Sequence, residues 1–331
     1  MTHASQLLAV QNLVTHFQGN RYTLFGGRPN IRAVDGISFE LNKGETLGIV
    51  GESGSGKTTL ARTILRLQRA TSGKVIFDGC DLLTASDADI RLIRRRMQIV
   101  FQNPYQALNP RFDVMEVISE AWRVHPGVIP RADWENKAVS LLEQVGLNGA
   151  FIRRYPHEFS GGERQRIGIA RALALDPELL ICDEPVSALD VSVQAQVVNL
   201  LSKIQRERRL AMLFVAHDLA VVKHIAQRVA VMYLGKVVEI GSTREVFSKP
   251  SHPYTKALLS AVPVSHPSMR NYSKRIVLRG DPPSPAFPPS GCRFRTRCWK
   301  ATELCSNVEP VMSVGSSDST KVACHFPERS P

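Results

Sequence analysis

Residues 51–58 read Gly51-Glu52-Ser53-Gly54-Ser55-Gly56-Lys57-Thr58, and Thr59 follows them directly. An apolar run from Leu47 to Val50 precedes this stretch, and the apolar residues after it, Leu60, Ile64 and Leu67, would share one face of a helix. The glycines let successive backbone N–H groups turn toward one anion, and the start of a helix adds partial positive charge. The pattern predicts a nucleotide phosphate-binding loop, with Lys57 on the β- and γ-phosphates and the Thr58 hydroxyl on Mg²⁺.

Two carboxylates follow a second apolar run. Leu179 to Cys182 reads as a buried strand, and Asp183 and Glu184 come directly after it. Carboxylate oxygens suit Mg²⁺, and a carboxylate beside a bound nucleotide can take a proton from an attacking water. We therefore assign Asp183 to the metal and Glu184 to the general base, although two acids at a strand end can also be a solvated edge.

The rest of the chain alternates short apolar runs with helical patterns. The other runs are Gln98 to Phe101, Leu213 to Val215 and Val229 to Tyr233. Runs of this length with helices between them favour parallel strands that are buried on both faces, so the sequence predicts an α/β sheet domain. Nearer the N-terminus, Ile37, Phe39 and Leu41 alternate with polar residues, as in a half-buried strand.

Composition sets the broad class. The chain has 331 residues, of which 43% are hydrophobic and 22% charged, and this is an ordinary globular mixture for roughly two domains. No apolar run reaches the ~18 residues that a membrane-spanning helix needs, and residues 1–6 lack the features of a secretory signal, so we expect a cytoplasmic protein. The net charge of +12 favours anionic partners such as nucleotides, phospholipids or nucleic acid, or is simply a basic surface.

Two regions depart from the sheet pattern. Residues from about 104 to 160 carry mostly helical patterning and are predicted to form a helical insertion between two strands. The last 69 residues hold ten of the twenty prolines and four of the six cysteines. We therefore divide the chain into residues 1–262, a nucleotide-binding domain, and residues 263–331, an irregular C-terminal extension.

Four further motifs resemble those of the ATP-binding-cassette (ABC) ATPases. Phe159-Ser160-Gly161-Gly162-Glu163 resembles the signature motif, and Ser160 stands 23 residues before Asp183, as in that family. The others are Gln102 in Phe101-Gln102-Asn103-Pro104 (the Q-loop), Ser187-Ala188-Leu189-Asp190 (the D-loop) and His217 after the next strand. The resemblance implies a RecA-like P-loop ABC ATPase core with an N-terminal antiparallel β subdomain and a helical insertion.

The resemblance also implies roles for these residues. Ser160, Gly161, Gly162 and Glu163 would act on the nucleotide of a second ATPase subunit, so that hydrolysis waits for dimer closure. Glu163 replaces the usual glutamine, and Phe159 the usual leucine. Gln102 would join Mg²⁺ or the water, and His217 would contact the γ-phosphate. Phe17 is the best match for an aromatic residue that stacks on adenine, Tyr22 is the second, and a core position for Phe17 is the alternative.

Longer strings are similar to the ATPase subunits of dipeptide and oligopeptide importers. They include residues 101–111, 155–159, 185–194 and 251–259, and the Asn-Pro-Tyr form of the Q-loop matches the second of two paired ATPases. The resemblance implies a heterodimeric ATPase partner, two membrane permeases, an extracytoplasmic solute-binding protein and a peripheral position on the cytoplasmic face of the membrane. Nickel and glutathione importers share these strings. A soluble cassette acting on nucleic acid or ribosomes is the alternative class, but one cassette without sustained heptads disfavours it, and we expect no nucleic-acid partner.

The four tail cysteines fit the same branch. Cys292, Cys298, Cys305 and Cys324 are separated by five, six and eighteen residues. Some members of the family bind a 4Fe–4S cluster here, so the resemblance implies one on these thiols. A Cys₄ zinc site and four unligated thiols are the alternatives, whereas disulfides do not suit a reducing cytoplasm.

Overall fold

The computed structural model describes residues 6–19, 29–262, 275–315, 317 and 319–328. The chain forms two compact units, and neither of them is continuous in sequence. The first consists of Met1–Leu7, Leu41–Thr46 and Thr84–Val215, and the second of Leu8–Glu40, Leu47–Leu83 and Ala216–Pro331. The domain boundary expected at residue 262 stays a prediction. Among the described residues, none of the helices has both the length and the apolar character that crossing a bilayer requires.

Three parallel strands form the sheet of the first unit, in the order β8 (Ala211–Ala216), β7 (Leu179–Asp183) and β6 (Met97–Val100). Every residue of β7 and β8 is buried. Burial on both faces explains why these strands read as continuous apolar runs instead of alternating patterns. The strands predicted from those runs are confirmed.

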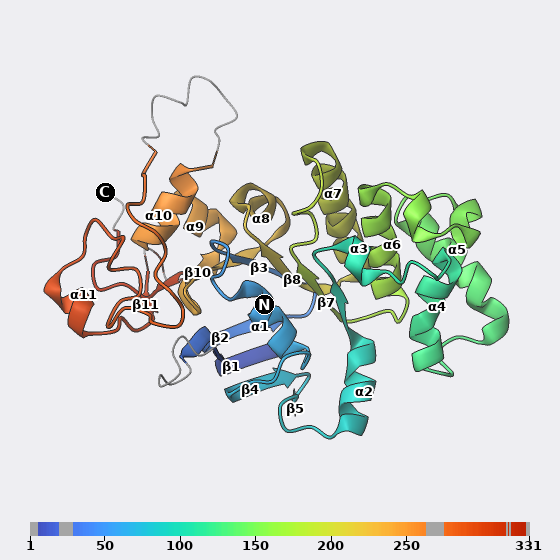
Figure 1. Cartoon of the computed structure of the whole chain (residues 1–331), viewed down its shortest axis with the longest axis horizontal. Helices are drawn as coiled ribbons and strands as arrows, with labels where there is room; N and C mark the ends of the chain where they lie inside the picture. Colours follow the sequence, from blue (N-terminus) through green and yellow to red (C-terminus); the bar gives the residue numbers. More distant parts are fainter. Residues whose placement is uncertain (1–5, 20–28, 263–274, 316, 318, 329–331) are drawn as a thin grey trace. The chain divides into compact units, whose positions relative to one another are not determined.

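Residues 84–215 of the first unit also form helices, which the intervening loops connect. The helices are α2 (Asp87–Arg96), α3 (Pro104–Ala107), α4 (Val114–Val124), α5 (Trp134–Gln144), α6 (Gly161–Leu173) and α7 (Val191–Arg208), with the 3₁₀ segments η1 (Arg131–Asp133), η2 (Gly149–Arg153) and η3 (Pro156–Glu158). In the region expected to be a helical insertion, α4 and α5 pack against each other and on α6 (Figure 1). Trp122 is central to this packing, because its Nε1 donates to the carbonyl of Ala174 at 2.8 Å and its ring lies 5.7 Å from that of Trp134.

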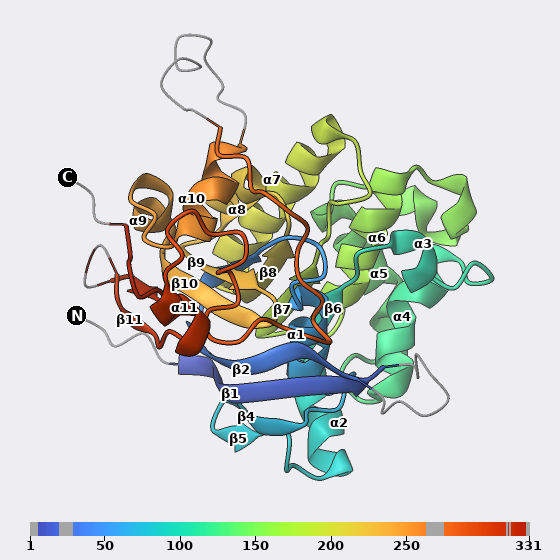
Figure 2. The same ribbon diagram turned by 60° about the vertical axis from the view of Figure 1, so that its left-hand side comes forward.

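The second unit holds the antiparallel sheet expected near the N-terminus. Its strand order is β2 (Asn30–Asn42), β1 (Gln6–Gln18), β4 (Ser72–Phe77) and β5 (Cys80–Asp81), and β1 and β2 run next to each other in Figure 2. β4 pairs antiparallel with both β1 and β5. The N-terminal antiparallel β subdomain is therefore confirmed.

The remaining strands of the second unit lie in the order β11 (Ser313–Val314), β12 (Lys321–Val322), β10 (Lys236–Ser242), β9 (Arg228–Tyr233) and β3 (Thr46–Val50). β3 and β9 are parallel, and the other pairs are antiparallel. The helices are α1 (Lys57–Ile64), α8 (Leu219–Ile225), α9 (Thr243–Ser248), α10 (Pro253–Ser260) and α11 (Glu303–Asn307). Because β12 pairs with β10, the described part of the C-terminal extension is anchored to the strand that follows β9.

One sequence expectation about α1 is wrong. The helix ends at Ile64, and Leu67, which was expected on its buried face, is 52% exposed. Arg66 has a φ of +51°, in the left-handed region, so the chain leaves the helical path before it reaches Leu67. Left-handed residues at helix ends are usually glycine, and an arginine there gives no local signal of the stop.

Candidate functional site

The phosphate-binding loop joins β3 to α1, as predicted. Gly54 and Gly56 have φ values of +79° and +101°, in the region that favours glycine. A Cβ on Gly56 would collide with the carbonyl oxygen of Ala33, so the loop requires glycine at this position. Because α1 begins at Lys57, the first N–H groups of that helix belong to the loop, at the end of the helix that carries partial positive charge.

Lys57 lies folded into this loop. It is only 4% exposed, and its Nζ donates to the carbonyl oxygens of Gly51 at 2.9 Å and Glu52 at 3.0 Å. The buried ammonium group of Lys57 therefore lies against the backbone of the loop. Lys57 is the residue predicted to contact the β- and γ-phosphates. This arrangement suits a strongly anionic ligand, because a buried cation gains most from an opposite charge.

The second unit also contains two other predicted site residues, His217 and Phe17, which lie in different segments. His217 is exposed and directly follows β8, just before Asp218, which caps α8 by accepting from the Ala220 N–H at 2.7 Å. Phe17 lies near the end of β1 and is partly buried. Tyr22, the second choice for an adenine-stacking residue, lies outside the described residues.

The acidic pair lies at the end of β7, as predicted. Asp183 is the last residue of that strand and is 1% exposed. Glu184 follows with a φ of +47°, a left-handed conformation that is uncommon outside glycine, and its N–H donates to the carbonyl of Val215 at 3.0 Å. Burial, with the charge of Asp183, raises the pKa of the adjacent Cys182 thiol, so Cys182 remains a neutral core residue.

Gln102 and Glu184, which were predicted independently from two motifs, are in contact. The Gln102 Nε2 donates to the Glu184 Oε2 at 2.9 Å, across 82 positions of sequence. Ser187 of the D-loop lies beside them, since its Oγ donates to the Glu184 carbonyl at 3.1 Å. A carboxylate oriented by an amide and adjacent to a second, buried carboxylate can hold Mg²⁺ and accept a proton.

The signature residues form the start of α6. Ser160 is the N-cap, and it accepts from the Glu163 N–H, while the Glu163 carboxylate accepts from the Ser160 N–H at 2.9 Å and from its hydroxyl at 2.7 Å. These hydrogen bonds lower the pKa of Glu163, so its carboxylate is ionised at neutral pH. Gly162 packs where a Cβ would meet Val193 of α7, which requires glycine there.

The two compact units divide the predicted residues between them. The first unit holds Gln102, Asp183, Glu184, the signature residues and the D-loop, and it brings Gln102, Glu184 and Ser187 together. The second unit holds the phosphate loop, Phe17, His217 and the four tail cysteines.

Sequence reasoning missed the side chains of the second unit that hold the phosphate loop from outside. The Tyr254 hydroxyl accepts from the Glu52 N–H at 2.9 Å, and Arg297 donates to the Glu52 carboxylate at 2.8 Å. The guanidinium of Arg297 also lies 6.0 Å from the ring centre of Tyr233. No spacing rule connects positions so far apart. Tyr254 stands in the string 251–259 shared with peptide-importer ATPases, whereas Arg297 stands in none of the quoted strings.

The four tail cysteines line one small pocket together with His252 and Phe294. All four are free thiols. Burial raises the pKa of Cys292 to about 11, and the other three thiols raise this pKa further, whereas a hydrogen bond with the Phe294 backbone lowers it. The four sulfurs are therefore near enough to interact. Within the described ranges, no group of three or more His, Cys, Asp or Glu side chains has the arrangement of a metal site.

Comparison with known proteins gives a consistent result. Residues 34–187 match the family model described as ABC transporter, and residues 238–305 match the oligopeptide/dipeptide transporter C-terminal region. The chain is 51% identical to the oligopeptide transport ATP-binding protein OppF of Salmonella typhimurium, over 92% of each chain. It is also 51% identical to the oligopeptide transport ATP-binding protein AppF of Bacillus subtilis, over 90% of each chain.

Solved structures agree. The dimeric ATP-binding cassette MJ0796, in a post-hydrolysis state with ADP and phosphate, is similar with a TM-score of 0.64 and 27% identity, over 72% of this chain and 99% of that one. The protein cbiO1 from Clostridium perfringens is similar with a TM-score of 0.62 and 28% identity, over 74% of this chain and 91% of that one. This chain belongs to the ATP-hydrolysing subunits of the ABC transporter family, in the group that carries the oligopeptide/dipeptide transporter C-terminal region.

Proposed function

We propose that this chain is the ATP-hydrolysing subunit that powers import of dipeptides or oligopeptides across the cytoplasmic membrane. Two observations support the peptide solute: the match of residues 238–305 to the oligopeptide/dipeptide transporter region, and relatives at about half identity that are named for oligopeptide transport. Nickel and glutathione remain the alternative solutes, because the sequence strings are shared with importers of both.

In this proposal the substrate is ATP with its Mg²⁺ ion. Gly51 to Thr59 bind the phosphates, with Lys57 contributing the buried positive charge, and Phe17 stacks on adenine. The hard oxygen ligands that Mg²⁺ prefers are those of Thr58, Gln102 and Asp183. Glu184 accepts a proton from the attacking water, and His217 contacts the γ-phosphate. The contact between Gln102 and Glu184 carries this assignment: the parallel register of β6 and β7 pairs Val100 with Cys182, and so brings the Q-loop amide to the carboxylate that follows β7.

We further propose that hydrolysis requires a second, homologous ATPase subunit. Ser160, Gly161 and Gly162 form the start of a 13-residue helix, which is an anion-binding element, and they would receive the nucleotide of the partner subunit. The D-loop residues Ser187 to Asp190 would lie at the same interface. The full assembly would add two permeases and an extracytoplasmic solute-binding protein, with this chain peripheral on the cytoplasmic face and without a nucleic-acid partner.

Reconstitution tests the proposed function. The ATPase pair, the two permeases and the solute-binding protein are placed in liposomes, with the binding protein outside and Mg·ATP inside. We expect an oligopeptide to accumulate inside and ATP turnover to rise when peptide-loaded binding protein is added. Transport of nickel or glutathione without peptide would instead select the alternative solutes, and stimulation of the ATPase by RNA alone would contradict a transport role.

Glu163 gives a prediction about the signature. Glu163→Gln keeps an oxygen that accepts from Ser160 but removes the negative charge that would face the partner's nucleotide. We expect the KM for ATP of the assembled transporter to fall by roughly threefold to tenfold, which corresponds to about 1 kcal/mol of removed repulsion.

Stability should change little in this variant, by about 0.5 kcal/mol or less, because glutamine also completes a capping box. Glu158→Gln is the matched control, since Glu158 makes the same kind of capping contact with the Tyr155 N–H at the start of η3. An unchanged KM in Glu163→Gln, measured by steady-state hydrolysis, would contradict the role given to this charge.

We also propose that the four tail thiols hold a 4Fe–4S cluster. Four cysteines are a suitable donor set for such a cluster, and their position around one pocket supports the assignment. The four thiols must lose their protons when the cluster binds. Binding of the cluster would then bring the sulfurs into the metal-binding arrangement that the described residues do not show. Anaerobic purification with iron and acid-labile sulfide analysis tests it: we expect both elements, and their loss in Cys305→Ser. Zinc in place of iron, or neither metal, would refute the cluster.

A further inference from the structure

The C-terminal extension contains a compact turn, residues 291–298, that packs against β9 and α10 of the second unit. In this 291–298 turn, the N–H groups of Arg295 and Arg297 donate to the carbonyls of Cys292 and Phe294 at 3.1 and 3.0 Å. The side chain of Phe294 is 1% exposed and packs against the rings of Tyr233 and Tyr254. The turn is therefore fixed in the core and presents its arginines in defined directions.

Arg297 reaches the phosphate loop itself. Its Nη1 donates to the Glu52 carboxylate at 2.8 Å, and the side chains of the two residues are 8% and 28% exposed. The backbone N–H of Glu52 is bound separately by the Tyr254 hydroxyl at 2.9 Å. Glu52 is thus held at both its backbone and its side chain by residues that stand about 200 positions or more later in the sequence.

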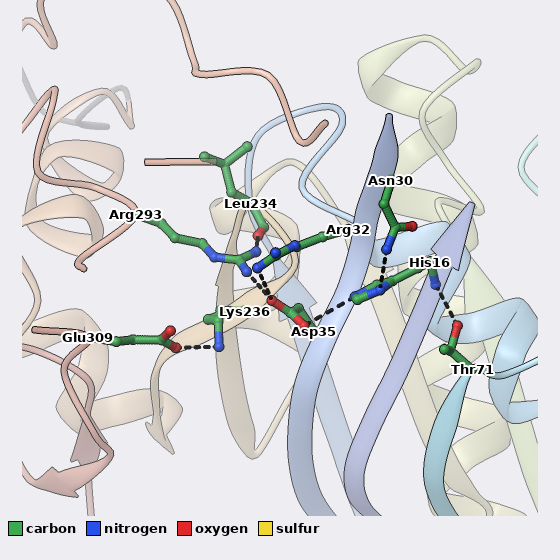
Figure 3. A network of polar contacts seen from close by, with 9 residues as sticks. All are labelled: His16, Asn30, Arg32, Asp35, Thr71, Leu234, Lys236, Arg293 and Glu309. Carbon is green, nitrogen blue, oxygen red and sulfur yellow. Dashed lines mark hydrogen bonds and ion pairs between the residues drawn. The ribbon is translucent and has the colours of Figure 1, made fainter. Parts of the chain in front are cut away.

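Arg293 contacts the connection between β9 and β10, at Leu234 (Figure 3). Its guanidinium donates to the carbonyl of Leu234 and forms an ion pair with Asp35 of β2. The next residue after Leu234, Gly235, donates its N–H to the carbonyl of Ser55 at 2.9 Å. The 291–298 turn therefore contacts the loop directly at Glu52 and through one intervening strand connection at Ser55.

The negative charge of Glu52 explains why a cationic partner such as Arg297 is needed beside the phosphate loop. A nucleotide triphosphate is strongly anionic, and a carboxylate inside its binding loop repels it. A guanidinium that is 8% exposed and hydrogen-bonded to that carboxylate neutralises the repulsion, and it does so with little screening by solvent. Without Arg297 the Glu52 carboxylate would lose this ion pair beside the site proposed for the phosphates.

We propose that Arg297 is a positioning residue for ATP: it neutralises Glu52 and fixes the phosphate loop, so that the C-terminal extension sets the affinity of this subunit for ATP. The inference rests on the proposed binding of nucleotide phosphates by residues 51–58. It assigns the extension a task in nucleotide binding that is separate from any ligand of the thiol pocket.

The test is a double-mutant cycle on the full chain, with adenylyl imidodiphosphate and Mg²⁺ as the probe, by titration calorimetry. We expect Arg297→Ala to weaken binding at least tenfold, and the double variant Arg297→Ala with Glu52→Gln to recover most of this loss, because the charge that needs neutralising is gone. Arg295→Ala is the matched control from the same turn. Its guanidinium contacts Ser290, and we expect its affinity to be unchanged.

Steady-state kinetics distinguish a role of Arg297 in ATP binding from unfolding of the C-terminal extension. In the assembled transporter, Arg297→Ala should raise the KM for ATP with kcat kept within about twofold, since the interaction serves binding equally before and during the reaction. If Arg297→Ala acts only by unfolding the extension, Glu52→Gln will not restore affinity, and the proposal is overturned. It is also overturned if Arg297→Ala binds the probe as wild type does.

A Lys57→Ala variant distinguishes failure of this inference from failure of the proposed function. Wild-type affinity in Arg297→Ala, with binding lost in Lys57→Ala, would remove only the role of Arg297. Equal binding by wild type and Lys57→Ala would show that residues 51–58 do not receive the phosphates, and both proposals would then fall.

Discussion

Replacing Glu184 with glutamine lowers the kcat of ATP hydrolysis by at least about a hundredfold, the loss expected when a general base is removed. The amide cannot take the proton of the attacking water at neutral pH. Its oxygen can still accept from the Gln102 Nε2, so the geometry of the site and the binding of ATP should persist. Single-turnover hydrolysis by the assembled transporter measures the chemical step directly.

Glu178→Gln is the matched control for this prediction. Glu178 stands directly before the same strand, β7, and is paired with Arg96 instead of facing the predicted site. We expect its kcat to stay within about twofold of wild type, because the pair is partly exposed and such pairs contribute little. Full turnover by Glu184→Gln would show that another group is the base.

We expect replacement of Lys57 with alanine to weaken ATP binding by at least about a hundredfold. The ammonium group is 4% exposed and lies against the loop carbonyls, so it meets the phosphates in a poorly solvated position where a charge-assisted contact is strongest. Equilibrium titration with adenylyl imidodiphosphate measures the effect.

Lys74→Ala is the comparison variant for Lys57→Ala. Lys74 is an exposed residue of β4 in the same unit, so its loss removes an equal charge from the surface. We expect no change in affinity beyond about twofold, since exposed charges are screened by salt. If the two variants bind the nucleotide equally well, Lys57 has no phosphate role.

Local sequence patterns predicted most of the fold. The apolar runs before Gly51 and before Asp183 are strands β3 and β7 because each is long enough to span a buried sheet and is closed by a turn. The helix starts were readable for a similar reason: Ser160 with Glu163 three residues later is a capping box. These features depend on residues within a few positions of one another.

The missed features depend on distant residues or on an unusual local backbone conformation. The contact between Arg297 and Glu52 spans 245 positions, and neither residue is unusual within its own segment. The end of α1 was placed too late because an arginine at position 66 adopts the left-handed conformation that glycine normally supplies. The compact units are interleaved along the chain, and nothing in the local composition indicates which separate stretches of sequence pack together.

The central claim is that nucleotide joins the phosphate loop of one ATPase subunit to the signature residues of another. Sedimentation velocity of the Glu184→Gln chain, purified with its paired ATPase subunit, tests this most directly. We expect separate monomers without nucleotide and a stable dimer with Mg·ATP. Identical sedimentation in both conditions, together with full-rate hydrolysis by the wild-type monomer, would contradict it.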